Sequence, residues 1–341
     1  FKKGLSCGQT MKTSSERTNQ MRITKEKAAG MLLSMDNILI LAHENPDGDA
    51  VGSACALCRG LRALGKNASI SLEAFSKHDM HLADGLFADS SFSYDYIVAV
   101  DTADNKILGV AEASLSKDCH VSLCIDHHVS NVFYAENTYL DEKAAAAAEA
   151  VYDILCLMNA EITPIIAECI YTALSTDTGC FRYSNTTAKT FRTAADMADK
   201  GIDIGYINKV HFETKSKEYA EMEKMAISSM QMYFDGKCAL LTITNDMFEK
   251  SGVADCETQP LSSLPRQIEG VCVGITMKEK KKGLFRISVR TNAPATASRI
   301  ASKLGGGGHT MAAGCSFEGT AEDAAKTILM HTENELKEAG L

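Results

Sequence analysis

The stretch NILILAHENPDGDAVGSACALCRGLRALG, at residues 37–65, decides the fold of this chain. Its first six residues are apolar apart from Asn37 and do not alternate, which is typical of a buried strand in a parallel sheet. A polar loop follows, and residues 50–64 then repeat apolar side chains at helical spacing up to Gly65, a residue type that commonly ends helices. A strand, a polar loop and a helix in this order predict the first half of a βαβ unit.

The same alternation of strands and helices continues along the chain. We expect a short helix at 23–35, strands at 37–42, 68–72, 96–100 and 121–125, and helices at 50–64, 144–158 and 165–174. This alternation indicates the α/β fold class, with a doubly wound parallel-sheet domain whose sheet is covered on both faces. Ligands of such sheets bind at the carboxyl ends of the strands.

A second, smaller α/β domain is expected after a helical connector. Strands are predicted at 237–244, 271–278 and 284–291, and helices at 295–304 and 321–338. We therefore expect a disordered tail or remnant at 1–20, an N-terminal domain at 21–186, a helical linker at 187–232 and a C-terminal domain at 233–341.

Composition narrows the class of protein. The 341 residues are 45% hydrophobic, and no apolar run approaches the roughly 20 residues of a membrane helix. Among 12 cysteines only Cys55 and Cys58 form a C-x-x-C pair, which lies in a predicted helix and fits a core face better than a zinc site. No targeting signal is evident, so we expect a cytoplasmic protein with reduced thiols and no membrane partner.

Charge and aromatic content bear on nucleic acid as a partner. The net charge of −9 disfavours tight binding to long nucleic acid. The chain has no Trp and 6% aromatic residues, so an extended base-stacking track is not expected. A short phosphorylated substrate stays compatible with this charge, because a metal centre attracts phosphate locally.

Acidic residues and histidines gather in four short motifs, each of which follows or closes an apolar run. The motifs are HENPDGDAVGS at 43–53, AVDTAD at 99–104, IDHH at 125–128 and STDTG at 175–179. Carboxylate oxygens mixed with imidazole suit Mn²⁺, Mg²⁺ or a related divalent ion. So many carboxylates in one pocket would repel one another unless cations neutralised them, so the pattern predicts a two-metal hydrolytic site.

The first two motifs place three carboxylates. Asp47 and Asp49 flank Gly48 in what we expect to be an extended loop, where two-residue spacing points both side chains to one side and the glycine allows a sharp backbone path. Asp101 closes a buried strand, where an uncompensated charge is costly. An ordinary turn is the alternative for the first pair, and a helix cap is the alternative for Asp101.

The other two motifs add the imidazoles and one more acid. Asp126, His127 and His128 close a strand, where one imidazole can bind a metal while the carboxylate orients it. Asp177 lies in a predicted turn and has an Asx-turn as its alternative. The remaining histidines are interpreted as surface or core residues: His78, His81, His120, His211 and His331.

Taken in this order, the four motifs resemble those of the DHH phosphoesterase family, and GGGGHTMAAG at 305–314 resembles the signature of the DHH-associated C-terminal domain. The compact length resembles the NrnA-like subgroup of oligoribonucleases and pAp phosphatases. The resemblance implies one cation on His43, Asp47 and Asp101, and a second on Asp49, Asp101, His127 and Asp177, with Asp101 bridging. It also implies that His128 faces the scissile phosphate and that Asp126 supports the imidazoles.

The C-terminal motif is a candidate grip for a phosphate. Gly306, Gly307 and Gly308 leave backbone N–H groups able to approach an anion, and His309 adds a side-chain donor. Arg290 ends a predicted strand and could clamp a terminal phosphate. A flexible linker or close backbone packing is the alternative for the glycines, and an ordinary exposed strand residue is the alternative for the arginine.

Weaker candidates lie in the N-terminal half. Asn131, Arg182 and Ser184 are candidates for phosphate or sugar contacts. Phe181 and Tyr183 follow STDTGC and could flank one base, with core packing as an equal alternative.

These features together predict a Mn²⁺-dependent phosphohydrolase with two divalent cations. We expect it to cleave very short oligoribonucleotides such as pApA to mononucleotides, with removal of the 3′-phosphate of pAp as a second activity, and to hold the substrate between its domains. The alternatives are a cyclic dinucleotide phosphodiesterase, a catalytically silent nucleotide-binding protein and a zinc-dependent scaffold. A homodimer is among the oligomeric states left open.

Overall fold

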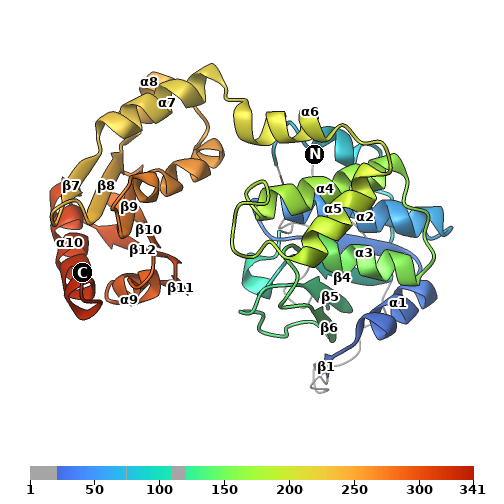
Figure 1. The fold of residues 1–341 in the computed structure, drawn as a ribbon. Coiled ribbons are helices and arrows are strands. Elements are labelled where there is room, and N and C mark those ends of the chain that lie inside the picture. Colours follow the sequence, from blue (N-terminus) through green and yellow to red (C-terminus); the bar gives the residue numbers. More distant parts are fainter. Residues whose placement is uncertain (1–20, 74, 110–119) are drawn as a thin grey trace. The chain divides into compact units, whose positions relative to one another are not determined.

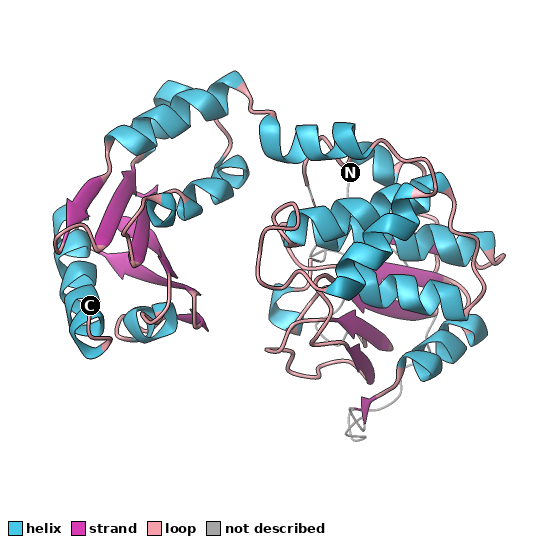
Figure 2. Ribbon diagram, in the orientation of Figure 1, coloured by secondary structure: helices cyan, strands magenta, loops and turns pink. Residues whose placement is uncertain are grey.

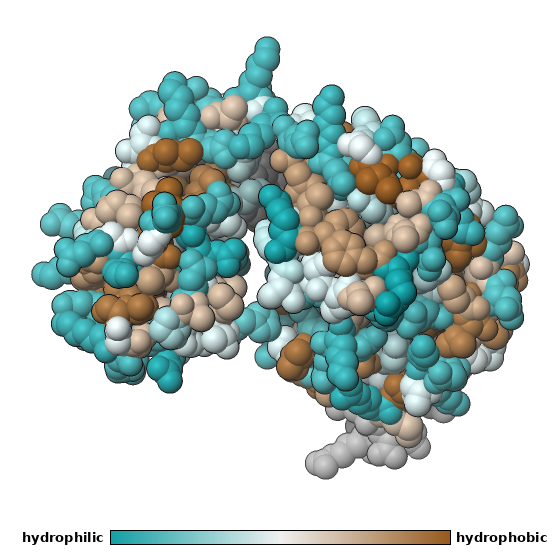
Figure 3. All heavy atoms as spheres, in the orientation of Figure 1, coloured by the Kyte–Doolittle hydropathy of each residue, from teal (hydrophilic) through white to brown (hydrophobic). Residues whose placement is uncertain are grey.

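The computed structural model describes residues 21–73, 75–109 and 120–341 (Figure 1). The chain divides into two compact units, and the boundary along the sequence lies between Thr214 and Lys215. The expected tail at 1–20 lies outside the described residues. Hydrophilic residues cover most of the visible surface of each unit (Figure 3).

The first unit is built on a six-stranded sheet in which every neighbouring pair of strands is parallel. Its strands are β1 (Met21–Arg22), β2 (Ile38–Leu41), β3 (Ala68–Ser71), β4 (Tyr96–Val100), β5 (Leu123–Asp126) and β6 (Asn137–Leu140). Their order in the sheet is β1-β6-β5-β4-β2-β3. The predicted α/β class with a parallel sheet is confirmed. The sequence pattern does not reveal β1 and β6, because these strands are short and partly polar.

Helices cover one face of this sheet (Figure 2). They are α1 (Lys25–Ser34), α2 (Gly48–Ala63), α3 (Ala147–Leu157), α4 (Pro164–Asp177), α5 (Ala188–Ala198) and α6 (Ile204–Asn208). Leu32, Leu57 and Ile154 are fully buried in one hydrophobic cluster with the inner side chains of β2, β4 and β5. Burial of each such side chain stabilises the fold by about 1.5–3 kcal/mol. On the other face, Leu39 and Cys124 pack against residues of connecting segments.

The order of the strands places a switch point between β2 and β4. From β2 the chain passes to β3 on one side, and it then continues with β4 on the other side of β2. In open α/β sheets the ligand site lies outside the carboxyl ends of the strands at such a point. His43 follows β2 and Asp101 follows β4, so the fold brings these two residues to the same edge.

The second unit is a mixed sheet with helices on both sides. Its elements are α7 (Lys217–Ser228), β7 (Gln231–Tyr233), β8 (Cys238–Ile243), α8 (Asn245–Ser251), β9 (Val273–Lys281), β10 (Leu284–Thr291), α9 (Ala297–Ser302), β11 (Gly307–His309), β12 (Ala312–Glu318) and α10 (Ala321–Glu338). The strand order is β11-β12-β10-β9-β8-β7, and all neighbours are antiparallel except β8 and β9. Side chains of α9 and α10 share one core with β9, β10 and β12.

The segment 187–232, expected to be a helical linker, is divided between the units. Residues of α5 and α6 belong to the hydrophobic core of the first unit. In α7, Tyr219, Met222 and Ala226 recur at helical spacing and pack against Leu241 and neighbouring apolar residues of the second unit. None of the described helices combines the length and apolarity needed to cross a bilayer.

Candidate metal centre

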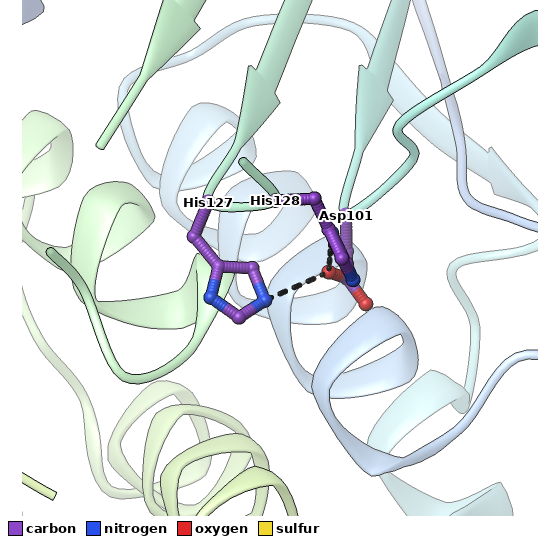
Figure 4. Close-up of side chains that lie close together, drawn as sticks. All are labelled: Asp101, His127 and His128. Carbon is purple, nitrogen blue, oxygen red and sulfur yellow. Dashed lines mark ion pairs between the residues drawn. The ribbon is translucent and has the colours of Figure 1, made fainter. Parts of the chain in front are cut away.

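The carboxylate of Asp101 lies beside the imidazoles of His127 and His128 (Figure 4). Its Oδ1 lies 3.5 Å from His127 Nε2 and 3.5 Å from His128 Nδ1, and its Oδ2 lies 3.6 Å from His43 Nε2. The aspartate comes from the end of β4, and the two adjacent histidines follow β5. One carboxylate therefore faces three imidazoles from the segments that follow β2 and β5, the two strands that flank β4 in the sheet.

The backbone and burial of Asp101 are unusual for an acid. The residue is 2% exposed and has a φ of 51°, in the left-handed region that costs non-glycine residues about 1–3 kcal/mol. Its Oδ1 has no hydrogen-bond partner among the described residues. A buried carboxylate oxygen without a donor implies an unseen partner, and a cation fits both the charge and the neighbouring donors.

Two of the histidines present the same nitrogen to the cluster. His43 Nδ1 lies 2.8 Å from the carbonyl oxygen of Glu44, and His127 Nδ1 lies 3.2 Å from that of Ala144. A carbonyl oxygen only accepts, so each Nδ1 carries the proton and each Nε2 faces the carboxylates. This arrangement is typical of histidines that bind metal ions, whose second nitrogen is held by a backbone carbonyl or carboxylate.

Asp49 is fixed by the start of a helix that lies far from it in sequence. Its Oδ2 accepts from Ala147 N at 2.6 Å and its Oδ1 accepts from Ala148 N at 3.1 Å, and Ser53 Oγ donates to Oδ1 at 2.9 Å. In the described structure Ala146, the N-cap of α3, makes no capping hydrogen bond with its side chain. Asp49 therefore caps α3 from α2, and the helix dipole favours its negative charge.

The expectation that Asp47 and Asp49 share an extended loop is wrong. Asp47 is the N-cap of α2, and its Oδ1 accepts from Asp49 N and Ala50 N at 3.1 Å each. Asp49 itself lies in the first turn of the helix. Aspartate is one of the residue types preferred at helix N-caps. Its side chain accepts hydrogen bonds there from the backbone N–H groups of the first turn, and an open loop offers no such donors.

Gly48 does not provide the sharp backbone path expected of it, and Asp177 does not lie in the expected turn. A Cβ on Gly48 would lie 2.4 Å from Thr176 Oγ1, so the glycine allows α2 to approach α4 closely rather than turning the chain. Asp177 is the last residue of α4 and not part of a turn. The Oδ2 atom of Asp177 lies 3.8 Å from His127 Nε2, and the Oδ2 atom of Asp49 lies 3.7 Å from the same nitrogen.

Asp126 holds the loop that carries the histidines. It is fully buried, and its Oδ1 accepts from His128 Nδ1 at 2.8 Å and from the backbone N–H groups of His127 and His128. Asn131 Nδ2 donates to its Oδ2 at 2.6 Å, and Asn131 Oδ1 accepts from Phe133 N. Asn131 is thus a buried partner of Asp126, a position different from the substrate contact expected of it.

The charges of the cluster act strongly on one another. Burial and the charge of Asp101 raise the pKa of Asp49 well above its ordinary value. Burial likewise raises the pKa of Asp177 to about 6, although His127 opposes this shift. Burial by itself lowers the pKa values of His43 and His127, but the facing carboxylates outweigh it and raise them to about 11 and about 10.

The structure brings all six predicted metal ligands together. Groups whose ligand atoms lie within 4.8 Å of one another are His43, Asp47 and Asp101; Asp49, His127 and Asp177; and Asp101, His127 and His128. Asp101 and His127 each belong to two groups, so the groups adjoin. Carboxylate and imidazole donors of this kind fit hard or borderline divalent cations.

The structure also shows supporting residues that the sequence analysis does not identify. They are Ser53 and the backbone N–H groups of Ala147 and Ala148. The run of five alanines at 144–148 indicates the two backbone donors, because small side chains at the start of a helix let a carboxylate approach the backbone.

In the second unit, Arg290 and His309 lie on one face of the sheet. Arg290 in β10 pairs with Ala312 in β12, which pairs with His309 in β11. Directly paired residues of antiparallel strands point to the same face, so these three form a row across three strands. Val289 and Ala313, one position away, are buried in the core on the other face.

The glycines of the 305–308 run have different surroundings. A Cβ on Gly306 would lie 2.2 Å from the carbonyl oxygen of Gly314, and one on Gly308 would lie 2.6 Å from that of Ala312. Close packing against β12 therefore explains both. No described atom lies within 4 Å of a Cβ placed on Gly307, so packing within the described residues does not explain that glycine.

The remaining candidates lie in the loop between α4 and α5. Arg182 is exposed, its Nε donates to the carbonyl oxygen of Gly179 at 2.5 Å, and its guanidinium lies 5.8 Å from the centre of the Phe212 ring. Ser184 is exposed in the same loop.

Comparison with known proteins agrees with this geometry. The model of the DHH family, N-terminal domain, matches residues 37–174, and that of the DHHA1 domain matches residues 243–338. The bifunctional oligoribonuclease and PAP phosphatase NrnA of Thermus thermophilus is 31% identical over 89% of this chain and 91% of its own length. The NrnA of Bacillus subtilis is 26% identical over 89% of this chain and 96% of its own length.

Solved structures show the same architecture. An exopolyphosphatase-related protein from Bacteroides fragilis matches 91% of this chain and 96% of its own, with a TM-score of 0.78 and 25% identity. RecJ of Thermus thermophilus in complex with Mn²⁺ matches 91% of this chain and 55% of its own, with a TM-score of 0.53 and 15% identity, which shows the fold alone.

The family match, together with an acid–imidazole cluster at the switch point of the parallel sheet, places the protein among the phosphoester hydrolases. Because a relative of 31% identity spans nearly its whole length, the chain belongs to the DHH family.

Proposed function

We propose that this protein is a two-metal phosphohydrolase that cleaves very short oligoribonucleotides such as pApA to mononucleotides and converts pAp to AMP. The observation that carries the proposal is the buried carboxylate of Asp101, which faces His43, His127 and His128 while its Oδ1 lacks a donor among the described residues. The relatives named NrnA support the choice of substrate.

The ligand groups suggest how two cations would be held. His43, Asp47 and Asp101 would hold one, and Asp49, Asp101, His127 and Asp177 would hold the other. Bound divalent cations, proposed to be Mn²⁺ as in the RecJ complex, would acidify a water and neutralise phosphoryl charge. Asp101 would belong to the ligand sets of both cations.

His128 and Asp126 would act on the substrate phosphate. The hydrogen bond from His128 Nδ1 to Asp126 leaves Nε2 to donate to a phosphoryl oxygen. Burial lowers the pKa of His128, but the bond to Asp126 and the charge of Asp101 outweigh it and raise that pKa, which favours the protonated ring. Asn131 would keep Asp126 in place rather than contact the substrate.

Residues of the second unit would bind the substrate phosphate or sugar. Arg290 and His309 share one sheet face with the small residue Ala312 between them, and a Cβ on Gly307 would have open space around it. A guanidinium, an imidazole and accessible backbone N–H groups are donors suited to phosphate. Arg182 and Ser184 remain candidates on the first unit.

A direct assay tests the proposal. Purified protein is incubated with pApA, pAp, cyclic di-AMP and a 24-mer RNA in the presence of Mn²⁺, Mg²⁺ or Zn²⁺, and the products are separated by chromatography. We expect AMP from pApA and pAp, with the highest rate in Mn²⁺, and little product from the 24-mer. Asp101→Asn, which keeps the shape but removes the charge, should abolish every activity.

The cyclic substrate distinguishes a second candidate function. The cyclic-di-AMP phosphodiesterase GdpP of Geobacillus thermodenitrificans is 21% identical over 84% of this chain and 46% of its own length. If cyclic di-AMP were hydrolysed faster than pApA, the second function would replace the first. If no substrate were hydrolysed in any metal, both would be wrong.

A further inference from the structure

The loop that joins α4 to α5 (Figure 1) lies beside the candidate metal ligand Asp177 at two points. It follows Asp177 directly, and it returns to it at Asn185, whose Nδ2 donates to Asp177 O at 3.2 Å and lies 3.5 Å from Asp177 Oδ2. Within the loop, the backbone N–H groups of Arg182 and Tyr183 both donate to the carbonyl oxygen of Thr178 at 3.0 Å. The backbone of Tyr183 is thus anchored to Thr178, the residue that follows Asp177.

The same loop contains three consecutive residues in the left-handed region. Gly179, Cys180 and Phe181 have φ values of 56°, 58° and 60°. Such a conformation persists in non-glycine residues only where the surroundings impose it, and such residues cluster at functional sites. Phe181 is part of the packing that holds the loop, because its ring lies 5.6 Å from that of Phe191 in a stacked arrangement. For Phe181, the structure therefore favours core packing over contact with a base.

Tyr183 has a different environment. A Cβ on Gly179 would lie 2.3 Å from its Cζ and 2.6 Å from both Cε1 and Cε2. The equal approach to the two Cε atoms means that Gly179 lies under one face of the ring. Tyr183 is nevertheless 50% exposed. The backbone at Gly179 therefore supports one face of the ring, while about half of the surface of the residue stays accessible.

We propose that Tyr183 is a base-stacking residue for the nucleotide whose phosphate is cleaved at the metal centre. The inference rests on the proposed function and adds to it a residue that selects for a base. A half-exposed aromatic ring with one face resting on the backbone is an arrangement on which a nucleobase can stack, and every base can use it because every base has a π face. A single platform, rather than a track, also suits a substrate of very few nucleotides.

Steady-state kinetics on paired substrates tests the proposal. KM and kcat are measured for pApA and for the same dinucleotide with abasic riboses, using the wild type, Tyr183→Leu and Tyr183→Phe. Removal of the ring in Tyr183→Leu should raise KM for pApA roughly 5- to 150-fold, the range that loss of one stacked base implies. It should leave KM for the abasic substrate unchanged, and Tyr183→Phe should behave as the wild type. Tyr206→Leu on α6, where a tyrosine is 56% exposed, is the matched control and should change neither value.

Each other outcome is informative. An unchanged KM of Tyr183→Leu for pApA would overturn the stacking role while leaving the proposed function intact. An equal loss on both substrates would also overturn it, because it would show that the ring only supports the loop. Absence of pApA hydrolysis by the wild type would instead refute the proposed function on which the inference rests.

Discussion

Each imidazole of the centre is oriented by a hydrogen bond at Nδ1, to a backbone carbonyl in His43 and His127 and to Asp126 in His128. These bonds fix the rings before any ligand arrives, so binding need not order them. The sequence indicates the three histidines through their acidic neighbours. It does not identify their partners, because backbone carbonyls carry no sequence signature.

Metal binding should release protons at neutral pH. The raised pKa values of His43, about 11, and of His127, about 10, mean that both rings are protonated at pH 7 in the metal-free protein, whereas a ligating nitrogen must be unprotonated. Titration calorimetry with Mn²⁺ in buffers of different ionisation enthalpy should report release of about two protons. Because fewer protons compete as pH rises, affinity should increase from pH 6 to pH 8. An affinity independent of pH would contradict this assignment of ligands.

Replacement of Asn131 should affect catalysis more than substrate binding. Asn131→Ala removes the 2.6 Å hydrogen bond to buried Asp126 and should lower kcat roughly 10- to 100-fold, with KM little changed. Asn137→Ala is the matched control, because the side chain of Asn137 donates at 3.2 Å to Ser122 O, next to the neighbouring strand β5. Both variants should lose stability in denaturant titrations, by about 1–3 kcal/mol, but only the first should lose activity. A similar fall in kcat for both would refute the specific role.

At the scale of elements, the acidic residues act through helix termini as well as strand ends. Asp47 caps α2, Asp49 caps α3 and Asp177 ends α4. The periodicity of the sequence predicts the helices, but it cannot show that the carboxylate of one helix caps another. That contact depends on the close approach of α2 to its neighbours, which Gly48 and Gly52 permit.

Proline at the first residue of α3 should weaken metal binding without breaking the helix. Ala147→Pro is tolerated there by backbone geometry, because the preceding residue is extended and the first helical position needs no intrahelical N–H. It removes the donor that lies 2.6 Å from Asp49 Oδ2. We expect roughly 10- to 100-fold weaker Mn²⁺ binding with unchanged circular dichroism.

The control is Ala188→Pro at the first residue of α5, where the N-cap Thr187 is also extended. It should leave Mn²⁺ affinity as in the wild type. Equal affinities for both proline variants would show that the α3 contact does not position Asp49.

At the scale of the whole molecule, the sequence indicates two α/β domains, and the structure has two compact units. The helical segment between them is harder to assign from sequence. Apolar periodicity in α7 shows that one face is buried but not against which unit, and only the contacts of Tyr219 and Met222 assign it to the second. The strands β11 and β12 are also missed, because glycine and alanine dominate the first half of this hairpin.

The second unit should contribute to substrate affinity and not to metal binding. Arg290→Ala should raise KM for pApA roughly tenfold, as expected for loss of a charge-assisted contact to phosphate, with kcat and Mn²⁺ affinity little changed. Arg299→Ala on α9 is the control, because its ion pairs with Glu335 and Glu338 lie away from the Arg290 face. An unchanged KM for Arg290→Ala would remove this residue from the proposed binding site.

Anomalous diffraction from crystals grown with Mn²⁺ tests the central claim most directly. The account predicts two manganese peaks roughly 3.5–4 Å apart, with one oxygen of Asp101 near each or a single oxygen between them. His43 and Asp47 should bind one ion, and His127 and Asp177 should bind the other. A map with no manganese at these side chains, or with ions that do not contact Asp101, would contradict it.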